Sequence, residues 1–187
     1  MKNNNKRNTI IIDVMLITIV LMAIGYAGLA TALTNKNTNN TSKASWNIGF
    51  SSITKNTTLS TSDAIEVNKP TSNGTSATFN VKLPKPGSKI VYDLVIQNTG
   101  TIDATLNSIS GIDALNMSQP TAITYKIDRL DGSNGKITSD IGDLFGTNGK
   151  NYFRVTIEWP SVPGQTIPTE GVSKAGTISL DYIQKKD

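Results

Sequence analysis

The sequence predicts an all-β fold, an antiparallel β-sandwich of the jelly-roll or immunoglobulin-like kind, preceded by one N-terminal hydrophobic helix. From residue 46 onward, apolar and polar residues alternate in short runs, as they do on strands that bury one face. Turn-forming segments such as PKPGS, DGSNG and GTNGKN separate these runs. No stretch after residue 33 keeps a helical period, so we expect this part of the chain to consist almost entirely of strands.

The first 33 residues combine a basic start with a long apolar segment. Lys2, Lys6 and Arg7 precede a stretch that carries no charge from residue 14 to residue 33. A helix needs roughly 20 apolar residues to cross a bilayer, and basic residues on its N-terminal side favour export of the chain that follows. We therefore expect residues 1–33 to be a signal peptide or a transmembrane anchor that contacts the membrane and the export machinery.

The sequence leaves cleavage of this leader open. Ala30 and Ala32 flank Thr31 in the small-x-small pattern that a signal peptidase recognises. The apolar stretch is also longer than a usual signal peptide, which favours a retained anchor. Residues 34–45 are rich in Asn and Thr and poor in apolar side chains, so they are expected to form a flexible spacer.

The predicted β-sandwich domain spans residues 46–187, with seven to nine strands in two sheets. The sequence DGSNG at 131–135 lies between two alternating runs and predicts a hairpin. Five aromatic residues fall on the apolar faces of predicted strands, where we expect them to pack in the core: Trp46, Phe79, Tyr92, Phe153 and Trp159.

The composition argues against most enzyme chemistry and against nucleic-acid binding. The chain has no cysteine and no histidine, which removes disulfides, thiolate sites and the commonest general base and metal ligand. Of the 18 basic and 14 acidic residues, 15 and 13 lie from Leu33 onward. No basic patch with interleaved aromatic residues stands out in that part, so we expect no nucleic-acid partner. No cofactor is expected either.

Carboxylates are the remaining candidates for chemistry. Four aspartates lie near one another in sequence, but their spacing does not fit a calcium-binding loop: Asp128, Asp131, Asp140 and Asp143. We therefore expect no metal site. Ser88 and Lys89 are adjacent on a predicted strand and so point to opposite faces. Glu66 and Glu158 are retained as a remote candidate pair for cleavage of a carbohydrate.

The segment NTGTID, at residues 98–103, joins two alternating runs and is expected to be a structural joint. Asn98 tolerates the left-handed backbone conformation, and Gly100 adopts positive φ without a steric penalty. Asp103 is able to accept hydrogen bonds from nearby backbone amides. Direct contact of this segment with a ligand is the less favoured alternative.

Several segments resemble small exported proteins of Gram-positive bacteria in the TasA/camelysin group, and more closely their short relatives from clostridia-like organisms. These segments are the leader ending GYAGLATAL, the following ASWNIGF, the block VYDLVIQNTGTIDATLNSI and the closing TISLDYIQ. The resemblance implies a jelly-roll-like β-sandwich. It also implies an extracellular matrix protein whose subunits form biofilm fibres after a signal peptidase trims them.

The leading functional prediction is a non-catalytic cell-surface or matrix protein that self-assembles into fibres. The peptidase activity associated with camelysin is not carried over, because this chain has no histidine to bind a metal. A membrane-anchored adhesion or ligand-binding module is the alternative. A cell-wall hydrolase that uses paired carboxylates is a more remote one.

Overall fold

The computed structural model describes residues 43–133, 135–138, 143–144, 146, 148–163 and 170–186, together with Met22. The chain divides into two units, and the second, Lys43–Asp187, is a compact β domain. The leader, the predicted cleavage residues Ala30 and Ala32 and the predicted spacer up to residue 42 lie outside the described residues, apart from Met22. In the described part of the chain, no helix is long and apolar enough to span a membrane.

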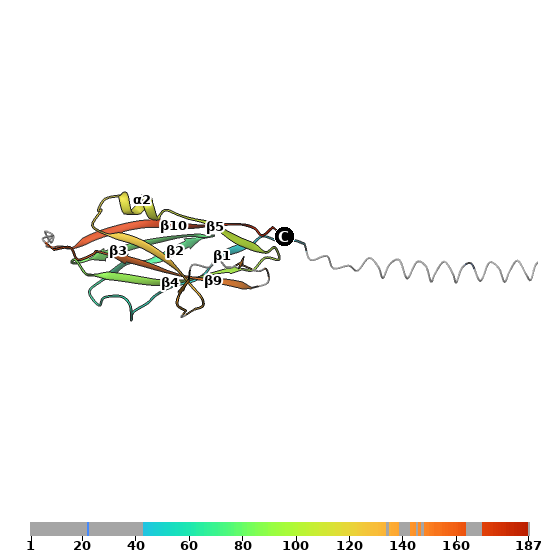
Figure 1. Cartoon of the computed structure of the whole chain (residues 1–187), viewed down its shortest axis with the longest axis horizontal. Helices are drawn as coiled ribbons and strands as arrows, with labels where there is room; N and C mark the ends of the chain where they lie inside the picture. The colour runs from blue at the N-terminus through green and yellow to red at the C-terminus, as the bar shows by residue number, and fades with distance from the viewer. Residues whose placement is uncertain are drawn as a thin grey trace, which may run out of the picture. The chain divides into compact units, whose positions relative to one another are not determined.

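The described residues form ten strands in two antiparallel sheets of five strands each, and Figure 1 shows how the sheets are arranged. The first sheet has, in spatial order, β1 (Ile48–Lys55), β4 (Lys89–Asn98), β9 (Gly149–Glu158), β6 (Thr124–Leu130) and β7 (Ile137–Thr138). The second has β2 (Ile65–Asn73), β3 (Ser76–Leu83), β10 (Val172–Gln184), β5 (Ala104–Ser110) and β8 (Asp143–Leu144). One short helix, α2 (Ile112–Met117), lies between β5 and β6 in the chain.

Connections between the two sheets dominate the topology. Among the described strands, β2–β3 and β6–β7 are the only consecutive strands that pair with each other. Each of the other connections between consecutive described strands passes from one sheet to the other. The hairpin predicted around residues 131–135 is confirmed, because Arg129 pairs with Thr138 and Leu130 with Ile137. Alternation predicts where strands lie along the sequence, but it does not reveal which strands are neighbours in each sheet.

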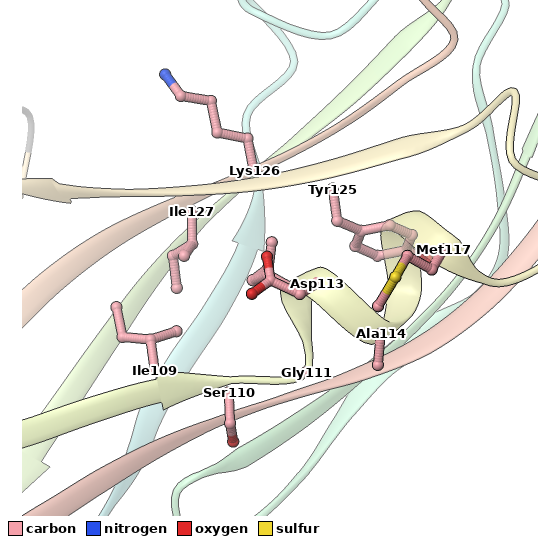
Figure 2. A pocket seen from close by; sticks show the side chains of 10 residues that line it. Ile109, Ser110, Gly111, Asp113, Ala114, Met117, Tyr125, Lys126 and Ile127 are labelled. Atoms are coloured by element: carbon pink, nitrogen blue, oxygen red, sulfur yellow. The ribbon is translucent and has the colours of Figure 1, made fainter.

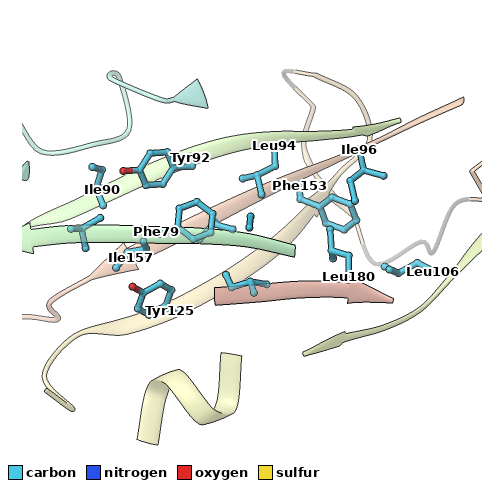
Figure 3. Close-up of a cluster of buried hydrophobic side chains, with 14 of the residues drawn as sticks. Phe79, Ile90, Tyr92, Leu94, Ile96, Leu106, Tyr125, Phe153, Ile157 and Leu180 are labelled. Atoms are coloured by element: carbon cyan, nitrogen blue, oxygen red, sulfur yellow. The ribbon is translucent and has the colours of Figure 1, made fainter. Parts of the chain in front are cut away.

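The inward faces of both sheets contribute to one hydrophobic core (Figure 3). The rings of Phe79 and Tyr92, from opposite sheets, lie with their centroids 5.1 Å apart, and Phe153 and Trp159 are also buried. The prediction for Trp46 is wrong, since 46 % of this residue is exposed. Trp46 precedes the edge strand β1, and the core begins only at Ile48, the first residue of that strand. These two antiparallel sheets over a shared core are consistent with the predicted β-sandwich.

Four elements carry no periodic signal in the sequence, although the turn sequence DGSNG predicted the hairpin that contains β7. Strand β2 exposes Ile65 and Val67, so the apolar positions in its sequence do not mark a buried face. Strands β7 and β8 contain two residues each, too few to show a period. Helix α2 has six residues, fewer than two helical turns, and therefore leaves no periodic signature either.

Candidate functional site

The segment NTGTID lies where three parts of the chain meet. Asn98, at the end of β4, is completely buried. Its side-chain amide donates hydrogen bonds to the carbonyl oxygens of Ile102, at 2.7 Å, and Leu144, at 3.2 Å. Its side-chain oxygen accepts a bond from the Gly100 amide at 3.0 Å. One buried side chain thus links the end of β4, the turn into β5 and strand β8.

Gly100 is needed for close approach of two backbones, and not for positive φ. In the described chain, positive φ occurs at Asn148 and at four glycines, so the predicted left-handed conformation at Asn98 and Gly100 is wrong. A Cβ atom at Gly100 would lie 2.3 Å from the carbonyl oxygen of Ser45. The reason is that the chain before β1 pairs with this turn: the Thr101 amide donates to the Ser45 carbonyl at 2.9 Å.

Asp103 holds a second segment to the joint. Its side chain accepts a 2.6 Å hydrogen bond from the amide of Gly146, and its carbonyl oxygen accepts one from Lys185 at 2.9 Å. The joint therefore ties together the start of the domain, the β8–β9 connection and the end of β10. Ser45, assigned to the flexible spacer by composition, belongs to this backbone pairing.

The carboxylates considered for catalysis lie in separate environments. Glu66, on β2, accepts a 2.9 Å hydrogen bond from the hydroxyl of Tyr92. Burial and the neighbouring Glu66 raise the pKa of Tyr92 above its ordinary value, which keeps this hydroxyl protonated and donating. Glu158 lies on the other sheet, in register with Lys89 and Thr124. No contact described in the structure brings the two glutamates together.

The remaining polar candidates also lie apart. Ser88 is buried and donates to Asp63 at 2.9 Å. Hydrogen bonds from Thr61, and then from Ser88, lower the pKa of Asp63 despite its partial desolvation. Asp128 pairs with Lys126 at 2.9 Å. Asp131 is exposed, while Asp140 and the side chain of Asp143 lie outside what the structure describes. Among the described residues, no three potential metal ligands cluster.

A groove lies between β5 and β6, and α2 closes one of its ends (Figure 2). Its volume at the α2 end is about 680 Å³, within the range of ligand pockets. Ile109 and Ile127 line this part and also the adjoining hollow beside β7. Met117, which is 76 % exposed, stands on the rim. We call this surface the β5–β6 groove.

Lys174, on β10, anchors the chain that follows α2. It is only 3 % exposed, and its ammonium donates hydrogen bonds to three backbone carbonyls at 2.9–3.1 Å: Ser118, Pro120 and Ile123. Burial lowers the pKa of Lys174 because removal from water disfavours the charged form. The three carbonyls compensate for the lost hydration and fix the segment between α2 and β6.

Asn116, in α2, occupies the place of a neighbouring strand beside β6. Its side chain donates to the Tyr125 carbonyl at 3.0 Å and accepts from the Tyr125 amide at 2.7 Å. Leu115 packs where a side chain at Gly176 would collide with it. Helix α2 is therefore held firmly against β6 and β10, and it forms a defined wall of the β5–β6 groove.

The sequence did not reveal the structural roles of Lys174 and Asn116 or the presence of the groove. Of these three features, only Lys174 left a recognisable signal in the sequence. Lys174 is the only charged residue at an inward position of β10, within the run Lys174, Gly176, Ile178 and Leu180. A lysine on an apolar face predicts either a pairing partner or a bend in the strand. Asn116 and the groove depend on contacts between segments that are distant in sequence.

Comparison with known proteins adds no relative. No family model, curated protein or solved structure matches this chain.

Proposed function

We propose that this chain is an exported, non-catalytic cell-surface or matrix protein with a jelly-roll-like sandwich, of the TasA/camelysin kind. The observation that supports this proposal most is the use of the buried polar side chains. Ser88, Asn98, Asn151 and Lys174 are the buried polar residues of the described chain. Each hydrogen-bonds to another part of the domain, as expected of groups that stabilise a fold.

The proposal includes self-assembly through the chain that precedes Ser45, since Ser45 and Asn47 already pair with the NTGTID joint. Strand β1 lies at the edge of its sheet, and the compact unit starts at Lys43. A segment that enters at a sheet edge is able to pair with the exposed edge of a second copy. We infer that the leader is either removed or kept as an anchor, and that this choice selects between a secreted subunit and a membrane-bound protein.

The test is to purify the chain from Leu33 onward and follow it by electron microscopy over time. Filaments, or incorporation into fibres on the native cell surface, are the expected result. A protein that remains monomeric and does not join such fibres would contradict assembly. N-terminal sequencing of the protein from its native surface identifies the processing site in the same material.

The β5–β6 groove favours a second candidate function, that of an anchored adhesion or ligand-binding module. An apolar groove with a volume of about 680 Å³ is large enough for a ligand to bury substantial surface. Under this candidate the leader stays on the protein, so membrane fractions contain the full chain. Deleting the leader then releases the protein from the membrane without changing ligand capture.

A further inference from the structure

We propose that the β5–β6 groove binds a short extended peptide with a cationic residue at its N-terminal end and apolar residues at alternate positions. The inference rests on the ligand-binding candidate above and names its ligand class. Formation of fibres would neither require it nor exclude it. Four features of the described residues carry it: an unpaired strand edge, an apolar floor, one end closed by α2 and an unpaired carboxylate.

The unpaired edge belongs to β5. On one side β5 pairs with β10, whereas on the other side β8 pairs only with Ala104 and Thr105. Residues 106–110 therefore have no neighbouring strand on their outer side in the described part of the chain. A register shift at Asn107 leaves Ser108–Ser110 as the regular part of this edge. An edge of this length suits a short segment and not a whole added sheet.

The facing edge of β6 is occupied at both ends of the groove. Asn116 already satisfies the backbone groups of Tyr125, and β7 covers Arg129 and Leu130. Strand β2, at the far edge of the second sheet, has two register shifts and contains Pro70, which are devices that discourage strand addition. These features select β5 as the edge that receives the peptide.

The floor and the ends of the groove define the length and the side chains of the peptide. Ile109 and Ile127 lie on the floor, α2 closes one end, and β7 borders the other. A peptide of about five residues spans roughly 17 Å when extended. Its alternate side chains, at positions 1, 3 and 5, then face the floor.

Charge complementarity sets the residue at the α2 end. Figure 2 shows the carboxylate of Asp113 directed into the groove, whereas Lys126 extends away from it. Lys126 is paired with Asp128 at 2.9 Å, while Asp113 forms no ion pair within the described residues. Asp113 therefore favours a cationic side chain beside it.

The direction of the peptide follows from β5. This strand runs toward α2, because Ser110 precedes Gly111 and Ile112. All strand pairs in the sheet are antiparallel, and antiparallel pairing is slightly more stable per residue. An antiparallel peptide begins at the α2 end, so its first side chain lies beside Asp113.

The experiment titrates the full chain into fluorescein-labelled peptides and records anisotropy. The peptides are KTVTVT, the charge-reversed ETVTVT and the strand-breaking KTVPVT, each blocked at its C-terminus by an amide. We expect KTVTVT to bind best, and KTVPVT to bind poorly because proline removes a backbone donor. Asp113→Lys should weaken KTVTVT and strengthen ETVTVT by about three- to tenfold each, as expected for an exposed charge pair.

Glu170→Lys is the matched control, since Glu170 is also exposed but lies outside the groove; it should leave both affinities unchanged. Hydrogen exchange of the KTVTVT complex should protect residues 106–110. The inference is overturned if neither charged peptide binds at millimolar concentration, if Asp113→Lys and Glu170→Lys act alike, or if KTVPVT binds as tightly as KTVTVT. Filament imaging, which tests assembly, is a separate measurement and does not decide this one.

Discussion

The two long sides of the β domain are closed in different ways. On the side of β1 and β2, backbone atoms join the two sheets directly: the Phe50 amide donates to the Gly74 carbonyl at 3.2 Å. At the NTGTID joint, the chain before β1 adds further backbone bonds, including Thr99 to Asn47 at 2.8 Å. On the side of β5 and β6, the side chains of Asn116 in α2 and Lys174 in β10 make the connecting hydrogen bonds instead, and a groove remains between the sheets.

This difference separates a structural region from an adaptable one. Backbone-to-backbone pairing is fixed by the path of the chain, so it leaves little room for a partner. Side chains such as Asn116 and Lys174 hold α2 through contacts that a single substitution removes. The β5–β6 side should therefore open locally, while the joint should open only when the domain unfolds.

The largest effect is expected from Asn98→Leu, which removes the buried amide at the joint. The carbonyls of Ile102 and Leu144 and the amide of Gly100 would lose their partner. Unsatisfied buried groups of this kind should lower the free energy of unfolding by about 3–5 kcal/mol. Unfolding in denaturant measures this loss in the free energy of unfolding. The exposed Asn107→Leu is the control, and an equal effect of the two would contradict the structural role of Asn98.

A somewhat smaller loss is expected from Gly100→Ala. The new Cβ would meet backbone atoms of Ser45 and Asn47 at 2.3 and 2.8 Å, so the chain before β1 must move away. We expect a loss of about 2–3 kcal/mol in the free energy of unfolding. At Gly132 a Cβ meets nothing within 4 Å, so Gly132→Ala should be nearly neutral. If both variants have the same melting temperature, the close approach at Gly100 is not required.

On the open side, Lys174→Met should cost about 1–2 kcal/mol near neutral pH. Three carbonyls lose their donor, and the relief of removing a buried charge offsets part of this loss. The faster amide exchange should be confined to residues 112–123. Loss of protection throughout the domain would show instead that Lys174 supports the core.

The same substitution predicts a dependence on pH. Burial lowers the pKa of Lys174 in the folded state below its ordinary value of 10.5, so between these two values the unfolded chain binds more protons. The stability of the wild type relative to Lys174→Met should therefore rise as the pH passes through the folded-state pKa, and level off above 10.5. Chemical unfolding of both proteins across alkaline pH measures this difference. A difference that falls with pH would contradict burial of the ammonium.

The smallest effect is expected from Asn116→Ala. The backbone groups of Tyr125 lose their side-chain partner but gain access to water, so the expected loss is about 1 kcal/mol. The Tyr125 amide should exchange faster by hydrogen-exchange NMR. Exposed Asn73→Ala, at the β2–β3 turn, is the control and should leave that amide unchanged. An unchanged Tyr125 amide in Asn116→Ala would show that α2 does not guard the edge of β6.

The sequence predicted the elements that depend on local pattern. Strands with one buried face, such as β3 and β4, show the alternation directly, and the hairpin at 131–135 has its turn sequence. The position of the joint was also readable from the residues of NTGTID. Its physical basis was not, because the need for Gly100 comes from Ser45, which lies 55 positions earlier.

The groove could not have been predicted from local pattern. It depends on which strands of the two sheets face each other, and on the placement of a six-residue helix. Trp46 shows the same limit in reverse. Its alternation with Ile48 predicted burial, but the end of the core, which decides its exposure, is a property of the assembled sheets.

Native-state hydrogen exchange in increasing denaturant tests the contrast between the two sides most directly. The amides of Phe50, Thr99 and Thr101 should exchange only with the free energy of global unfolding. Those of α2, of Tyr125 and of the β5 edge should exchange at a clearly lower free energy, through local opening. Equal opening free energies on the two sides, or easier opening at the joint, would contradict the account.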